Sequence, residues 1–125
     1  MFKDSQTFSS FAVDDLDAAR TFYGDTLGLD VSDVEMAGLL AVDTAGGRIM
    51  VYAKPDHVPA TFTILNFEVD DVAAAVDSLN AKGVEMLRYD QFEQDEKGIV
   101  TEEGPQIAWF NDPAGNVLSV VEAGF

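Results

Sequence analysis

The chain has no cysteine, a single histidine and only 7 basic residues among its 125. The absence of cysteine excludes a disulfide framework, a thiolate metal site and a thiol nucleophile. No apolar run approaches the roughly 18 residues that suggest a membrane span, and residues 1–6 do not begin an apolar leader. We therefore expect a cytoplasmic protein with no membrane partner.

Acidic residues outnumber basic residues by 23 to 7, which gives a formal net charge of -16. The electric field of this negative charge repels phosphate backbones and anionic lipids, so we expect no nucleic-acid partner. Solubility is the favoured explanation of this charge. Attraction of a cationic ligand is the alternative that stays open.

An internal repeat at an offset of 56 residues is the strongest signal in the sequence. Residues 11–19 read Phe-Ala-Val-Asp-Asp-Leu-Asp-Ala-Ala, and residues 67–75 read Phe-Glu-Val-Asp-Asp-Val-Ala-Ala-Ala. Apolar residues alternate before each Asp pair and follow a helical spacing after it, so each copy predicts a strand that leads into a helix. The same supersecondary unit therefore occurs twice.

The ends of the two predicted helices match as well. One aspartate of each pair is expected to cap the helix N-terminus. The candidates are Asp14 or Asp15 in the first copy and Asp70 or Asp71 in the second. The first helix is predicted to end at about Leu27 and the second at about Lys82. Gly28 and Gly83 then follow as left-handed stops.

Three further strands are predicted in each copy. Their ranges are 29–33, 39–43 and 48–53 in the first copy and 84–89, 107–111 and 117–122 in the second. Pro55 and Pro59 would block a central strand, so residues 55–60 are interpreted as a linker. The sequence thus predicts one α+β domain over residues 1–125, built from two βαβββ modules at about residues 5–54 and 61–125.

Three strings mark the first helix and the final hairpin of this plan. They are Ala18-Ala-Arg-Thr-Phe-Tyr23, Leu27-Gly-Leu29 and Phe110-Asn-Asp-Pro-Ala-Gly-Asn-Val117. Together with the order of the elements, they make nearly the whole chain resemble the glyoxalase, bleomycin resistance protein and extradiol dioxygenase superfamily, the vicinal oxygen chelate proteins. The resemblance implies a curled mixed sheet around a cleft, a small-molecule ligand and a homodimer.

Metal-dependent members of that family hold a divalent ion with side chains from the first and last strand of each module. Counted from the Asp pairs and the hairpin glycines, these positions fall at Phe8, Val51, Ile64 and Ser119. Three hydrocarbon side chains and one hydroxyl are a poor donor set for such an ion, so we expect neither a metal site nor another cofactor. The one histidine, His57, is interpreted as an exposed turn residue of the linker.

Strand alternation and the resemblance together predict which side chains line the cleft. The candidate ligand contacts are Phe8, Ser10, Val51, Ile64, Asn66, Glu68, Tyr89, Phe92, Trp109 and Ser119. Their mixture of apolar and polar groups is typical of a small-molecule pocket, and a concave face packed shut is the alternative. Residues 89–105 look too polar for a core and are interpreted as either a lid or a solvated loop.

The leading hypothesis is a metal-independent protein that binds a small molecule and sequesters a cationic or aromatic compound. The first alternative is a lyase or isomerase of the same superfamily, either metal-free with Glu68 as the base or with a weak metal site that the sequence does not reveal. The second is a structural or regulatory partner with a packed cleft. Glu68 is the one weak catalytic candidate, because the sequence offers no histidine-activated nucleophile and no glycine-rich phosphate loop.

Overall fold

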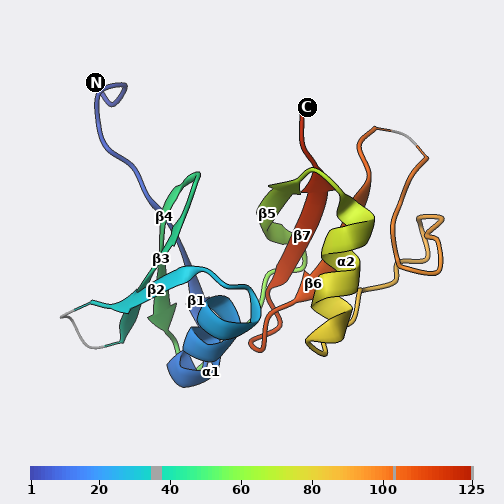
Figure 1. Cartoon of the computed structure of the whole chain (residues 1–125). Coiled ribbons are helices and arrows are strands. Elements are labelled where there is room, and N and C mark those ends of the chain that lie inside the picture. The colour runs from blue at the N-terminus through green and yellow to red at the C-terminus, as the bar shows by residue number, and fades with distance from the viewer. Residues whose placement is uncertain (35–37, 103, 125) are drawn as a thin grey trace. The chain divides into compact units, whose positions relative to one another are not determined.

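The computed structural model describes residues 1–34, 38–102 and 104–124 and divides the chain into two compact units, Met1–Val58 and Pro59–Phe125 (Figure 1). The division falls inside the segment predicted as a linker. Each unit combines a mixed β-sheet with a helix, which confirms the α+β class predicted from the sequence.

The first unit contains a four-stranded sheet in the order β1-β4-β3-β2, with β1 parallel to β4 and the other neighbours antiparallel. Its elements are β1 (Ser9–Val13), α1 (Leu16–Arg20), the π-helical turn η1 (Thr21–Thr26), β2 (Asp30–Asp33), β3 (Leu39–Thr44) and β4 (Gly47–Ala53). The single helix predicted to reach Leu27 therefore widens after α1. In η1 the Leu27 N–H donates to the Phe22 carbonyl, five residues back.

The second unit contains a three-stranded sheet in the order β5-β7-β6, with β5 parallel and β6 antiparallel to β7. Its elements are β5 (Thr63–Val69), α2 (Val72–Ala81), β6 (Ile107–Asn111) and β7 (Val117–Glu122). Figure 1 shows α2 alongside β6 and β7, which it contacts. The apolar side of α2 is buried through Val72, Val76 and Leu79, and the strands beneath it bury Phe110 and Leu118.

Aspartate caps begin both helices, as the repeat predicts. Asp15 and Asp71 each accept a hydrogen bond from the backbone N–H three residues later, at 3.1 and 3.0 Å, so the second aspartate of each pair is the cap. Gly28 and Gly83 stand at φ angles of 72° and 86°. Both are therefore the left-handed stops that the sequence indicated.

The predicted face of Val51 is wrong. Val51 pairs with Phe11 across β1 and β4, and the Phe11 ring lies 5.7 Å from that of Tyr23 in η1. Residues paired across neighbouring strands project from the same face, so Val51 faces the helical side of its sheet, where it is fully buried. It does not line the face opposite the helix.

The error arises from hairpin length. Two residues connect the last pair of the β3–β4 hairpin, whereas five connect the last pair of the β6–β7 hairpin, so counting from the hairpin glycines shifts the register. Strand pairing gives a better correspondence: Ser119 pairs with Asn66, and the repeat partner of Asn66, Ser10, pairs with Met50. Met50 is therefore the first-unit counterpart of Ser119.

Residues 84–89, predicted as a strand, do not form one. The Gln94 side chain takes the place of a strand partner: its Nε2 donates to the carbonyls of Leu87 and Gly98 at 2.9 and 2.8 Å, and its Oε1 accepts from the Tyr89 N–H at 2.7 Å. One amide group thus ties three backbone stretches together. We refer to residues 87–100 as the braced segment.

The braced segment is also anchored to the body of the second unit. The Leu87 N–H donates to the Trp109 carbonyl of β6 at 2.7 Å, and Ile99 and Val100 are only 3% and 8% exposed. The expectation that residues 89–105 lie outside the core is therefore wrong for these two side chains. Residue 103 of that range lies outside the described residues.

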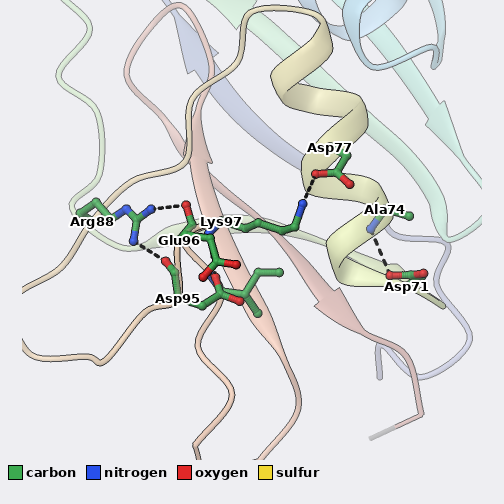
Figure 2. A network of polar contacts seen from close by, with 8 residues as sticks. Asp71, Ala74, Asp77, Arg88, Asp95, Glu96 and Lys97 are labelled. Carbon is green, nitrogen blue, oxygen red and sulfur yellow. Dashed lines mark hydrogen bonds and ion pairs between the residues drawn. The ribbon is translucent and has the colours of Figure 1, made fainter.

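Two basic side chains of the braced segment, Arg88 and Lys97, make further contacts, as Figure 2 shows. Arg88 donates from its guanidinium to the carbonyls of Asp95 and Glu96. Lys97 forms an ion pair with Asp77 on α2, at 2.5 Å, and this hydrogen bond raises the pKa of Lys97. The pair is exposed, so its contribution to stability is small.

Replacing the cap Asp71 by alanine should lower the free energy of unfolding of the second unit by about 0.5–2 kcal/mol, because the Ala74 N–H loses its acceptor. Urea unfolding followed by the emission of Trp109, the single tryptophan, measures the change. Asp70→Ala removes the same charge one residue earlier and is the matched control. Equal losses in the two variants would contradict the assignment of the cap.

Gln94→Leu keeps the side-chain volume but leaves the Tyr89 N–H and the two carbonyls without their side-chain partner. We expect a loss of about 1–3 kcal/mol in the free energy of unfolding. Gln91→Leu makes the same change at an exposed position of the segment and should leave the urea midpoint nearly unchanged. A Gln94→Leu protein as stable as Gln91→Leu would show that the brace contributes nothing.

Candidate functional site

The helix α2 packs against one face of the second sheet, and a row of paired residues crosses the other. Asn66 pairs with Ser119, and Ser119 pairs with Trp109, so these three side chains form a row across β5, β7 and β6. The Ser119 hydroxyl is fully buried and donates to Asn66 Oδ1. A satisfied polar pair therefore lies next to the indole of Trp109.

An aromatic cluster stands at the end of this row. Phe92 stacks on Trp109, with ring centroids 5.3 Å apart and ring planes inclined by 24°. Tyr89 meets both rings edge-on, at centroid distances of 5.3 Å from Trp109 and 6.3 Å from Phe92. These offset-stacked and edge-to-face arrangements are the ones that aromatic pairs prefer. The braced segment contributes two of the rings and β6 the third.

A pocket of about 210 Å³ opens beside the cluster. Its lining residues are Thr61, Phe62, Thr63, Tyr89, Gln91, Phe92, Trp109 and Val117. Thr63 joins this wall because an irregularity between Thr63 and Leu65 brings it into register with Val117. Every lining residue is uncharged, and the two phenylalanines, 69% and 43% exposed, form its outer wall.

The charges around the pocket are negative. Glu93 follows Phe92 directly, and a hydrogen bond and charge repulsion from Glu93 raise the pKa of Glu102. Two carboxyl groups therefore share one small region beside the aromatic cluster. The basic Arg88 and Lys97 are engaged elsewhere, with backbone carbonyls and with Asp77. An entering cation would meet little competition from the protein's own positive charges.

Of the residues predicted to contact a ligand, the structure brings Tyr89, Phe92 and Trp109 together in the pocket wall. Asn66, Glu68 and Ser119 share the sheet face of Trp109 without lining the pocket, because Glu68 pairs with Val121 two residues along from the Asn66–Ser119 pair. Those predicted positions that belong to neither group are Phe8, Ser10, Val51 and Ile64.

These remaining positions differ in their surroundings. Phe8 is 67% exposed just before β1, and Ser10 is exposed on that strand. Ile64 is half-buried at the irregularity of β5. Glu68 is an exposed residue of β5, so it does not have the enclosed, apolar surroundings expected of a metal-free base.

The predicted ligand contacts omit five lining residues: Thr61, Phe62, Thr63, Gln91 and Val117. The alternation of β5 assigns Thr63 to the other face, because a strict period of two does not anticipate the irregularity that follows it. Phe62 carried a usable signal, since a large apolar residue directly before a strand in a polar stretch is a candidate contact. Gln91 and Thr61 have no distinguishing pattern.

The residues at the family's metal positions do not fit a divalent ion. With the corrected register they are Phe8, Met50, Ile64 and Ser119, which offer one thioether and one hydroxyl that already donates to Asn66. Such ions take imidazole, carboxylate or thiolate ligands. His57 is half-buried in the turn after β4. Across residues 1–34, 38–102 and 104–124, no three His, Asp or Glu side chains gather closely enough to hold a metal.

The solved structures that resemble this chain share its fold over nearly their whole length. A glyoxalase/bleomycin resistance protein from Streptomyces sp. CB03234 is 25% identical with a TM-score of 0.67, over 94% of this chain and 100% of that one. TnmS3, an antibiotic binding protein from the same Streptomyces, is 23% identical with a TM-score of 0.70, over 97% and 98%. Lactoylglutathione lyase from Agrobacterium tumefaciens is 21% identical with a TM-score of 0.69, over 100% of both chains.

No curated protein sequence matches the chain. The family model that does match is described as the Glyoxalase/Bleomycin resistance protein/Dioxygenase superfamily, and it covers residues 7–120. This range includes both repeats, both aspartate caps and the whole wall of the aromatic pocket. The chain therefore belongs to the glyoxalase, bleomycin resistance protein and dioxygenase superfamily, as its repeat and hairpin strings indicated.

Proposed function

We propose that the protein binds a planar cationic small molecule, without a metal ion, in the aromatic pocket of its second unit. The observation that carries the proposal is the pocket itself: four aromatic rings and uncharged polar groups form its wall, and carboxylates stand beside it. Mostly apolar walls with a few polar groups are typical of small-molecule sites. Sequestration of such a compound is the role that this chemistry supports best.

The size of the pocket limits what it holds. Its volume of about 210 Å³ is below the roughly 300–1,000 Å³ of pockets that enclose a drug-sized ligand. The pocket therefore accommodates a single ring system or a cationic group, and the rest of a larger ligand would extend outward past Phe62. An extended ligand anchored by one planar part fits this geometry.

Charge favours a cation over an anion. The face of an aromatic ring attracts a cation by about 0.5–2 kcal/mol, depending on how far the cation is desolvated. Glu93 and Glu102 add negative potential beside Phe92, and a net charge of -16 concentrates cations around the whole molecule. The ring faces, the two glutamates and the net negative charge would each weaken the binding of an anionic ligand of the same shape.

The similar proteins support the proposal at the level of the scaffold. One of them is described as an antibiotic binding protein and another as a glyoxalase/bleomycin resistance protein, and both align with nearly the whole of this chain. A fold of this plan therefore supports antibiotic binding in one of these proteins. We extend that class of ligand to this protein as part of the proposal.

The proposal includes the homodimer and the cytoplasmic location that the sequence suggested. In the part of the chain that the structure describes, no helix is long and apolar enough to cross a membrane. Binding at the pocket needs residues of one unit only, so the proposed ligand contacts do not depend on the assembly.

Titration with 9-aminoacridine, a planar cation, should quench the Trp109 emission to saturation. Acridine-9-carboxylate has the same ring system with a negative charge and should bind about 2- to 30-fold more weakly. Trp109→Leu, examined by calorimetry, should lose most of the affinity, while Phe2→Leu, which changes an exposed aromatic residue outside the pocket, should not. Equal affinity for both acridines, or no quenching by either, would refute the proposal.

Removal of metal ions should leave binding intact. After dialysis against EDTA, the Kd for 9-aminoacridine is expected to stay unchanged, because the pocket wall contains no carboxylate, imidazole or thiolate. The measurement is the same fluorescence titration before and after dialysis, with metal content checked by elemental analysis. Loss of binding that Zn²⁺ or Mn²⁺ restores would contradict metal independence.

A further inference from the structure

One face of the Trp109 indole is already occupied. Phe92 lies on it in an offset stack, with 5.3 Å between the ring centroids. A ligand ring needs about 3.5–4.0 Å between its own carbons and those of each neighbouring ring. Two rings at this spacing leave no room for a third, so the pair must separate before anything planar stacks on this side of the indole.

The two ends of the turn that carries Phe92 are fixed, whereas its tip is held more weakly. At the base, Gln94 accepts from the Tyr89 N–H at 2.7 Å and donates to two carbonyls of the braced segment. At the tip, the Phe92 N–H donates to the Tyr89 carbonyl over a long 3.3 Å, and the ring is 43% exposed. The Phe92 side chain can therefore move without disturbing the brace.

We propose that Phe92 is a gating residue: it covers Trp109 in the unliganded protein and must swing off the indole before a planar ligand can stack there. This inference rests on the proposed function, because it concerns the same pocket. The ring takes the position of a ligand on its own binding surface. Entry is consequently slowed by the stability of the Phe92–Trp109 stack.

Removing the gate should speed entry. The interaction within an aromatic pair corresponds to a factor of about 2 to 13 in an equilibrium constant. In Phe92→Ala the association rate constant for 9-aminoacridine, followed by stopped-flow quenching of Trp109, should rise by a factor in this range. Phe2→Ala, which removes an exposed phenylalanine outside the pocket, should leave the association rate near that of the unchanged protein.

A measurement without ligand tests the covering of Trp109 directly. The Stern–Volmer constant for quenching of Trp109 by acrylamide should rise at least about 2-fold in Phe92→Ala, because the indole face loses its cover, and should stay unchanged in Phe2→Ala. Phe92→Leu keeps an apolar anchor at the tip and should give an intermediate value. This second variant also decides the question if the alanine protein folds poorly.

The outcomes distinguish a failure of the proposed gate from a failure of the proposed function. Unchanged acrylamide quenching in Phe92→Ala and Phe92→Leu would overturn the gate, whatever the acridine does. An equal association rate with and without the Phe92 ring would overturn it as well. Increased acrylamide quenching together with no acridine binding in any variant would confirm that Phe92 covers Trp109 and overturn the proposed ligand class.

Discussion

Three hydrogen bonds of one side chain hold the aromatic pocket in place. The Gln94 amide joins the backbone at Leu87, Tyr89 and Gly98, which allows residues 84–89 to lie beside β6 without becoming a strand. Buried or half-buried peptide groups need partners, and here a side chain supplies what a neighbouring strand would. Tyr89 and Phe92 reach Trp109 only because this arrangement fixes the segment that carries them.

The two faces of the sheet in the second unit have different roles. The face beneath α2 is apolar and buries Ala108, Phe110, Leu118 and Val120, and this burial supplies hydrophobic free energy that stabilises the unit. The opposite face carries the row of Asn66, Ser119 and Trp109, whose polar members satisfy each other. A polar pair that is internally satisfied has little chemistry left to offer, so the indole is the part of the row that can recognise a ligand.

Recognition in this site depends on shape, ring faces and electric field. The wall contains no charged side chain, while carboxylates at Glu93 and Glu102 stand beside it and oppose each other. A cation bound as proposed would reduce that repulsion and gain from the ring quadrupoles at the same time. The same physics would disfavour an anion.

The sequence predicted the fold well because its signals are local. The aspartate caps and glycine stops recur 56 residues apart, and a cap or a stop depends on only a few neighbouring residues. The face of Val51 was mispredicted because register depends on hairpin length, and the two hairpins differ. Errors of one residue matter here, since they move a side chain to the other face of the sheet.

The site was only partly predictable from the sequence. Tyr89, Phe92 and Trp109 were recognisable as aromatic residues near one polar stretch, although their contact depends on long-range packing. Gln94 gave no signal, because a glutamine in a polar segment looks the same whether its amide is solvated or bonded to three peptide groups. Thr63 was missed because the irregularity in β5 breaks the alternation on which its face was predicted.

Ligand binding in the aromatic pocket is tested by following the single indole N–H of Trp109 by NMR while 9-aminoacridine is added. Binding there should cause large shifts of this resonance and of the amides of Thr63, Phe92 and Val117, with small changes on β1 and β4 of the first unit. Shifts concentrated on the first unit, with the Trp109 indole unaffected, would show that the ligand binds elsewhere and would contradict the central claim.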